Sequence, residues 1–216
     1  MPAQNHQQDH LLDGAALLRN EPVQARSTAR LATLLDSAAA VIDEVGYERL
    51  TTAMVAERAG ASIGTVYRYF PDRIVVLQGL SARYLEQCVE RTTRSITESR
   101  HENWVDAVLG AIDELAAAFR TEPGFRSLRF GDVLDVRPAL HSVPGAAVVA
   151  SRMAQAVTQR FGTEDSDLAF RLDVAISLAD ALLARAFAVS KKGDEKFVTE
   201  AKAVARGYLE GFFAAK

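Results

Sequence analysis

Apolar residues recur at intervals of three and four along most of the chain, and alternation with a period of two is scarce. The first spacing places residues on one face of an α-helix, whereas alternation indicates a strand. The pattern is clear between about 28 and 45, where the apolar positions are Leu31, Leu34, Leu35, Ala38, Ile42 and Val45. The chain is therefore expected to be all-α.

Local capping signals divide the first third of the chain into short helices. Gly46 ends the first helix, since glycine accepts the left-handed conformation that closes a helix. Hydroxyl and carboxylate side chains are good first caps because they accept a hydrogen bond from a free backbone N–H. The expected caps and helices are Thr51 for 52–59, Ser62 for 63–69 and Asp72 for 73–99.

The remaining pattern predicts five further helices, which gives about nine in all. They are placed at about 102–121, 124–131, 144–161, 165–191 and 194–214, with an irregular loop at 132–143. Residues 1–26 are polar and aperiodic, as in a disordered arm. Three short helices over 27–73 thus precede a larger helical domain over 74–216, and the helix 73–99 belongs to both.

The helix expected at 63–69 carries an unusual outer face. At about 100° per residue, one side gathers a packing face. The other side gathers a missing side chain, a hydroxyl, a guanidinium and a phenol. The packing residues are Ile63, Val66, Tyr67 and Phe70, and the outer residues are Gly64, Thr65, Arg68 and Tyr69.

Two short helices joined by a tight turn at Gly60 match a helix-turn-helix, whose second helix lies in the major groove of DNA. Arg68 suits guanine or phosphate, Thr65 suits a thymine methyl or a phosphate, and Tyr69 can reach the backbone or stack on a sugar and base. Free N–H groups at the start of both helices can bind phosphate. The predicted DNA-contacting residues are Thr51, Ser62, Gly64, Thr65, Tyr67, Arg68, Tyr69 and Arg73.

The net charge of −3 does not favour nucleic acid as a partner, whereas a basic balance would. Residues 26–75 contain six arginines and six acids. Attraction to DNA must therefore come from placement, with Arg26, Arg30, Arg68 and Arg73 facing DNA and the acids facing away. A helical hairpin whose polar side faces water is the alternative.

The run 46-GYERLTTAMVAERAGASIGTVYRYFPDR-73, preceded by 31-LATLLDSAAAVIDEV-45, resembles the TetR family of bacterial transcriptional repressors over about 45 residues. The resemblance implies an N-terminal DNA-binding domain and a C-terminal domain for ligand binding and dimerisation. It implies phosphate contacts from Thr51 and Tyr67 and groove contacts from Thr65, Arg68 and Tyr69. Arg73 stands where a lysine is common and keeps the positive charge at that phosphate contact.

The last two helices are too apolar to be covered on one face alone. One flank is expected to pack on the chain's own core and the other on a second copy, as in a four-helix interface. Ordinary core packing is the alternative. The predicted dimer residues are Leu172, Ile176, Leu183, Val204, Tyr208 and Phe212.

A ligand pocket in the C-terminal domain is implied by the family resemblance. Asp180 could face solvent, pair with an arginine or meet a cationic ligand. Apolar residues of this kind are more often part of the core than of a pocket. The candidate residues are Trp104, Phe119, Phe125, Phe130, Met153, Phe170 and Asp180.

The sequence contains few residues suited to metal binding or catalysis. Cys88 is the only cysteine, and the four histidines show no spacing typical of a metal or catalytic motif. Neither a cofactor nor a metal is expected, and there is no apolar run of membrane-spanning length and no signal peptide. We expect a cytoplasmic homodimeric repressor that binds double-stranded operator DNA and is released by a small-molecule inducer. The alternatives are a helical enzyme and an interaction module that does not bind DNA.

Overall fold

The computed structural model describes residues 13–129, 144–163 and 165–211, with residues 13–24 described by their backbone alone. Over these ranges the chain forms helices and no strands, as the periodicity predicts. The elements are α1 (Asp13–Val45), η1 (Tyr47–Arg49), α2 (Thr52–Arg58), α3 (Ile63–Tyr69), α4 (Arg73–Thr97), α5 (Trp104–Thr121), α6 (Phe125–Leu128), α7 (Gly145–Phe161), α8 (Leu168–Ala186) and α9 (Glu195–Gly211).

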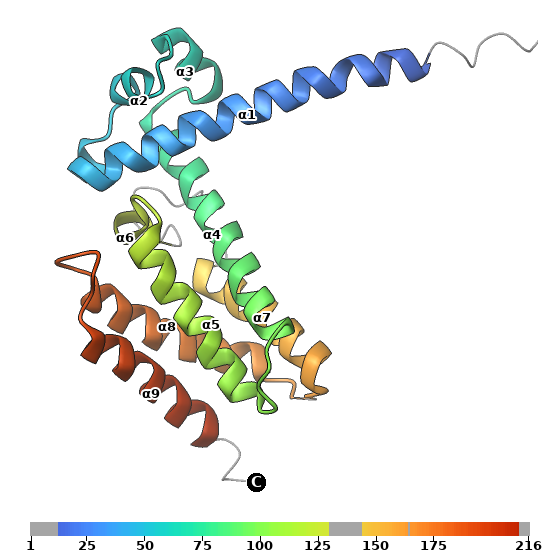
Figure 1. Ribbon diagram of the computed structural model, residues 1–216, viewed down its shortest axis with the longest axis vertical. Helices are drawn as coiled ribbons and strands as arrows, with labels where there is room; N and C mark the ends of the chain where they lie inside the picture. Colours follow the sequence, from blue (N-terminus) through green and yellow to red (C-terminus); the bar gives the residue numbers. More distant parts are fainter. Residues whose placement is uncertain (1–12, 130–143, 164, 212–216) are drawn as a thin grey trace, which may run out of the picture.

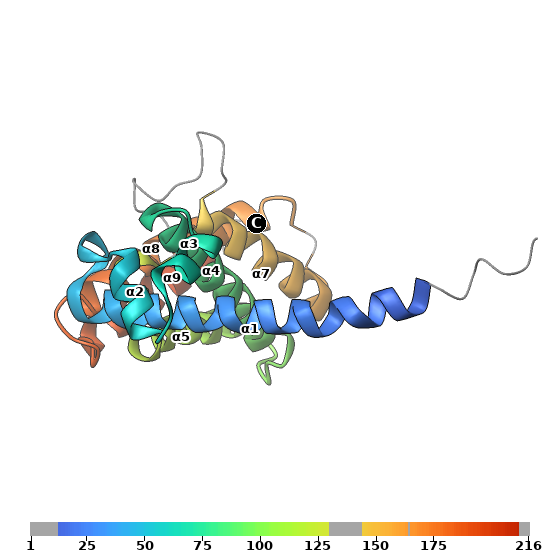
Figure 2. The ribbon, with the colours of Figure 1, turned by 90° about the horizontal axis from the view of Figure 1, so that it is seen from above.

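The molecule has a small N-terminal part and a larger helical body, which α4 connects (Figure 1). Helices α2 and α3 lie against the second half of α1, while the first half of α1 projects beyond them (Figures 1 and 2). In the body, α8 packs against both α7 and α9, and α4 packs against α5 and α7. None of the helices within the described ranges is long and apolar enough to span a membrane.

The three predicted N-caps of the first helices are confirmed. The side chains of Thr51, Ser62 and Asp72 accept hydrogen bonds from the third backbone N–H beyond each cap, at 3.2, 3.1 and 3.0 Å. Gly46 and Gly60 have φ values of +84° and +58°, which residues with a side chain rarely adopt. The short helices therefore begin and end where the local signals indicate.

Two predicted boundaries are wrong. Helix α1 begins at Asp13, so residues 13–26 do not form the expected disordered arm. The segment contains Ala15, Ala16, Leu17 and Leu18, whose high helix propensity a search for an amphipathic stripe does not detect. Helix α8 ends at Ala186, before 191, and its last carbonyl accepts from the backbone N–H of Asp194. The expected loop at 132–143 lies outside the described residues, and so do Phe130 and Phe212.

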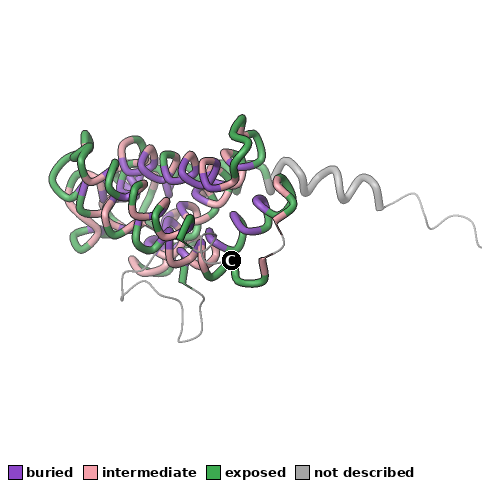
Figure 3. The backbone as a smooth tube through the Cα atoms, turned by 90° about the horizontal axis from the view of Figure 1, so that it is seen from below, coloured by how far each residue is buried: buried purple, intermediate pink, exposed green. Residues whose placement is uncertain are grey.

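One apolar core runs through both parts of the molecule (Figure 3). The start of α4 lies so close to the N-terminal part that a Cβ added at Gly79 would approach Phe70 to 3.3 Å and Leu35 to 3.5 Å. Such close packing fixes the position of α4 relative to α1 and α3. The N-terminal part and the body are thus joined by packing as well as by the continuous helix.

Candidate nucleic-acid interface

Helices α2 and α3 form a tight pair that exposes one side of α3. The turn between them is closed by backbone hydrogen bonds from Gly60 to Glu57 and from Ala61 to Ala56, at 3.2 and 2.9 Å. Val66 and the cap residue Phe70 are buried, with exposed fractions of 0% and 3%. These two side chains hold α3 on the core, so the opposite side is available to a partner.

The predicted outer face is partly as expected. Gly64 and Arg68 are exposed, while Thr65 is half-buried and its hydroxyl lies 2.9 Å from that of Ser62. The Arg68 guanidinium forms no ion pair within the described residues, so its charge is available to an anion. It lies 5.2 Å from the centre of the Tyr69 ring, which orients it.

Three residues of α3 differ from the helical-wheel prediction. Ile63 and Tyr67 were expected to pack, but they are 41% and 51% exposed. Tyr69 was expected to point outward, but it is half-buried against the core. A helix of seven residues contacts its neighbours through little more than one turn, so border positions follow the neighbours' shape, which a wheel does not contain.

The exposed phenol of Tyr67 lies at the start of α2, with its oxygen 3.5 Å from the Thr52 hydroxyl. Free backbone N–H groups at a helix start favour a phosphate. Thr51 is exposed there, but its hydroxyl already caps α2. Arg73 donates to the backbone carbonyl of Glu48 at 2.6 Å, so part of its guanidinium closes the η1 turn.

The charges of this part are partly segregated, although residues 26–75 contain as many acids as arginines. A groove of about 670 Å³ lies between α1 and α3, and no carboxylate is among the described residues that line it. Acids of the same segment are paired elsewhere: Asp36 with Arg83, Asp43 with Lys191 and Glu44 with Arg58. The groove residues are Arg26, Ser27, Arg30, Arg68 and Tyr69.

The surroundings of the groove lower the pKa of its tyrosine. The pKa of Tyr69 lies below its ordinary value, chiefly because of the hydrogen bond to Ser27, with further lowering by Arg68 and Arg30. The Tyr69 hydroxyl lies 3.3 Å from that of Ser27 and 3.4 Å from Arg68. Sequence reasoning missed Ser27 because a lone serine at the start of a helical stripe carries no signal.

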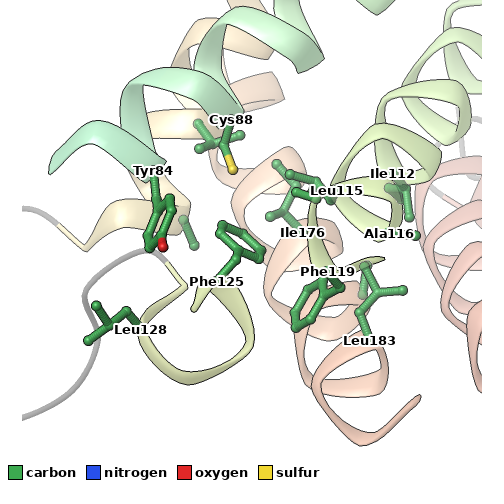
Figure 4. Packing of buried hydrophobic residues seen from close by; sticks show 14 of the residues in the cluster. Tyr84, Cys88, Ile112, Leu115, Ala116, Phe119, Phe125, Leu128, Ile176 and Leu183 are labelled. Atoms are coloured by element: carbon green, nitrogen blue, oxygen red, sulfur yellow. The ribbon is translucent and has the colours of Figure 1, made fainter. Parts of the chain in front are cut away.

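The candidate ligand residues differ in burial: most lie in the core, and one is exposed on the surface. Phe119 and Phe125 pack edge to face at 5.1 Å in the buried core, and Cys88 points toward the same cluster (Figure 4). Burial raises the pKa of the Cys88 thiol to about 12. Met153 is fully buried and Trp104 is half-buried, whereas Phe170 is 67% exposed on α8 and does not line an interior site.

Asp180 pairs with an arginine, one of the three alternatives for this residue. Its carboxylate lies 3.0 Å from the guanidinium of Arg129. Arg129 has a φ of +43°, the one positive value of a non-glycine residue in the described ranges. Such a conformation is strained and persists where the surroundings hold it, here with the help of the ion pair.

All three predicted dimer residues on α8 pack in the core, which is the alternative that the sequence left open. Leu172, Ile176 and Leu183 are fully buried within the monomer and cannot contact a second copy. The outer face of α8 carries Phe170 and Leu178, which are 67% and 40% exposed. Helix α8 has apolar residues on its outer as well as its inner face, so the sequence does not distinguish the two.

The predicted dimer residues on α9 are less buried than those on α8, and two glycines lie near them. Val204 and Tyr208 are half-buried. A Cβ added at Gly207 or Gly211 would meet nothing within 4 Å.

The described part of the chain contains no cluster of three or more metal-ligating side chains.

Comparisons with known proteins agree with this geometry. The family description "Bacterial regulatory proteins, tetR family" matches residues 34–77, and "Tetracyclin repressor-like, C-terminal domain" matches residues 102–213. A TetR-family transcriptional regulator from Streptomyces coelicolor is 37% identical, with a TM-score of 0.69 over 84% of this chain and 98% of that one.

Two further relatives are more distant. The HTH-type transcriptional repressor KstR of Mycobacterium tuberculosis is 26% identical over 183 residues, which are 85% of this chain and 70% of that protein. The regulator FadR from Bacillus subtilis, solved in complex with stearoyl-CoA, is 18% identical. It has a TM-score of 0.60 over 83% of this chain and 98% of that one.

The described fold and the exposed recognition helix define a helix-turn-helix regulator with a helical C-terminal domain. The chain belongs to the TetR family of bacterial regulatory proteins. Its function is accordingly that of a transcriptional regulator.

Proposed function

We propose that the protein is a cytoplasmic homodimer that represses transcription by binding a pseudo-palindromic operator in double-stranded DNA, and that a small-molecule inducer releases it. No catalytic step is part of this function. The observation that carries the proposal is the capped α2–α3 pair, whose outer side has exposed cationic and phenolic groups, while three of the six acids of the same segment are paired elsewhere.

The side chains of this site have distinct roles in the proposal. Arg68 contacts a guanine or a phosphate in the major groove, and Thr65 contacts a thymine methyl or a phosphate. Tyr67 and the start of α2 bind backbone phosphates, as do Ser62 and the second guanidinium nitrogen of Arg73. Gly64 allows the backbone of α3 to approach the DNA closely.

A second copy of the chain would cover the outer faces of α8 and α9. Phe170 and Leu178 present apolar surface there, and Gly207 and Gly211 leave room for a partner helix. Helices whose contact positions are small approach to the short end of the usual 8–10 Å range. A two-fold dimer places two copies of α3 on half-sites one or more DNA turns apart.

The contacts of Asp43 couple movements of the body to the DNA-binding part. This α1 carboxylate accepts from the backbone N–H of Gly124 at 3.3 Å and lies 3.8 Å from Arg126, both next to or in α6. It also pairs with Lys191 in the α8–α9 connection. A ligand that displaces α6 would therefore displace α1 as well.

The inducer is proposed to be largely apolar, because aromatic and aliphatic side chains fill the body between α4, α5 and α8 (Figure 4). The complex of FadR with stearoyl-CoA is consistent with a ligand of this kind. For release, the ligand must bind the DNA-incompetent conformation more tightly than the competent one.

Selection of DNA sequences by the purified full-length chain tests the proposal. The selected DNA is expected to contain an inverted repeat, and Arg68→Ala is expected to lose about 1–3 kcal/mol of discrimination at one base position. Arg100→Ala, which removes an exposed arginine of the body, is the matched control. Failure to enrich any sequence would favour an interaction module that does not bind DNA.

A further inference from the structure

We propose that the groove between α1 and α3 is a second phosphate-binding site, in which Arg26 and Arg30 of α1 hold the DNA backbone beside the major-groove contacts of α3. The inference rests on the proposed function and adds a separate element to the interface. It assigns α1, outside the helix-turn-helix, a direct role in DNA affinity.

The charge of the groove has no internal counterpart. Arg26, Arg30 and Arg68 converge on it, and within the described residues none of the three pairs with a carboxylate. By contrast, Arg58 in the same domain pairs with Glu44 at 2.5 Å. Converging like charges repel each other, and an anion between them replaces that repulsion with attraction.

The shape of the groove is held by a contact between distant parts of the chain. Ser27 and Tyr69 are 42 residues apart, and their hydroxyls lie 3.3 Å from each other. Tyr69 also contacts Arg68 through its hydroxyl and its ring. We therefore assign Tyr69 the role of a positioning residue that joins the two walls, in place of the DNA contact that the sequence predicts.

The arrangement of the arginines fits a nucleic-acid strand better than a single small anion. Arg26 and Arg30 are four residues apart on one face of α1, a rise of about 6 Å. Phosphates follow one another every 3.4 Å along the axis for each DNA strand, so the separation of about 6 Å spans nearly two steps, and the flexible side chains can reach two neighbouring phosphates of one strand. The guanidinium fork matches phosphate oxygens in a way that an ammonium group does not.

The position of the groove selects DNA as its occupant. Arg68 belongs both to the groove and to the outer face of α3, so a duplex in contact with α3 passes directly over it. The projecting half of α1 continues beyond α3 (Figure 2). Residues 25–29 are exposed there. DNA bound to α3 would therefore meet α1 at the backbone that flanks the half-site.

The test uses the full-length chain and its selected DNA, with affinities measured by fluorescence anisotropy over a range of KCl concentrations. Arg26→Ala with Arg30→Ala is compared with Arg100→Ala with Arg152→Ala, which removes two charges from exposed positions of the body. We expect the groove variant to bind at least tenfold more weakly at low salt. The slope of log affinity against log salt should become less steep by about two per protomer, at about 0.9 per phosphate contact.

Two further measurements separate the groove from its neighbours. Hydroxyl-radical footprints of the groove variant should lose protection beside the half-site and keep it within the half-site, with the base preferences unchanged. Arg26→Lys with Arg30→Lys should keep the steep salt slope, because the charges remain, but bind more weakly than the wild type.

Equal affinity and slope in the groove variant and the body control would overturn the inference, while Arg68→Ala still reports on the proposed function. Loss of binding to inorganic triphosphate without any change in DNA binding would also overturn it, and would assign the groove to a small anion. If the wild type enriches no DNA sequence, it is the proposed function that fails.

Discussion

Replacing Asp43 with alanine is expected to reduce the free energy of unfolding by about 2–4 kcal/mol. The side chain is 17% exposed and has three partners. A hydrogen bond from a backbone N–H to a carboxylate contributes about 1.5–3 kcal/mol. Lys191 is 51% exposed, so its ion pair adds at most about 1 kcal/mol. The Arg126 contact is long and adds less than that.

Asp36→Ala is the matched control, because Asp36 also joins α1 to another helix through an arginine, Arg83. The Asp36 side chain is 71% exposed and accepts no backbone N–H in the described residues, so its loss should cost about 0.5 kcal/mol. Asp43→Asn keeps an acceptor for Gly124 and should fall between the two. Urea unfolding followed by circular dichroism measures all four proteins, and equal values for the two alanine variants would refute the role given to Asp43.

Three other predictions concern single side chains. Because the pKa of Cys88 is raised from 9.0 to about 12, the unfolded chain binds fewer protons than the folded chain between these pH values. The free energy of unfolding should therefore be unaffected by Cys88 below pH 9 and fall above it, by up to about 1.4 kcal/mol per pH unit more than in Cys88→Ala, as urea titrations from pH 8 to 11 would measure. A Cβ at Gly64 meets only the Ser62 hydroxyl, at 3.9 Å, so Gly64→Ala should keep or raise stability by up to about 1 kcal/mol while weakening DNA binding at least tenfold in anisotropy titrations. Unchanged affinity would mean that the backbone of α3 does not approach the DNA closely. Gly207→Leu has open space in the monomer, so sedimentation should detect a folded protein whose dimer dissociates at least tenfold more readily, and an intact dimer would place the interface elsewhere.

The parts of the fold that follow from local chemistry could be predicted from the sequence. Thr51, Ser62 and Asp72 each satisfy a backbone N–H three residues on, so the short helices begin where those side chains stand. The orientation of a side chain at the border of a helix depends on neighbours that are distant in sequence. Tyr67 and Tyr69 therefore exchange their expected positions, since Tyr69 finds Ser27 and the core while Tyr67 remains exposed.

In the candidate site, too, features that depend on neighbouring residues could be predicted from the sequence, and features that depend on distant contacts could not. The outer face of α3 could be predicted because Gly64, Thr65 and Arg68 lie within two turns of one helix. Asp43 could not, because an acid on an amphipathic helix ordinarily faces water. Its partners, Gly124 and Lys191, are 81 and 148 residues away in the sequence, and only the folded chain brings them together.

The close packing at Gly79 determines what a small movement in the body does at the DNA. Helix α4 has 25 residues and is therefore about 37 Å long. Because Gly79 lies directly on Phe70 and Leu35, the DNA-binding part turns with the helix and does not slide over it. A tilt of about 5° about the far end of α4 would carry this part sideways by about 3 Å, close to the 3.4 Å rise between successive base pairs. A rotation too small to disturb the packing of the body is thus enough to displace a recognition helix by one base pair.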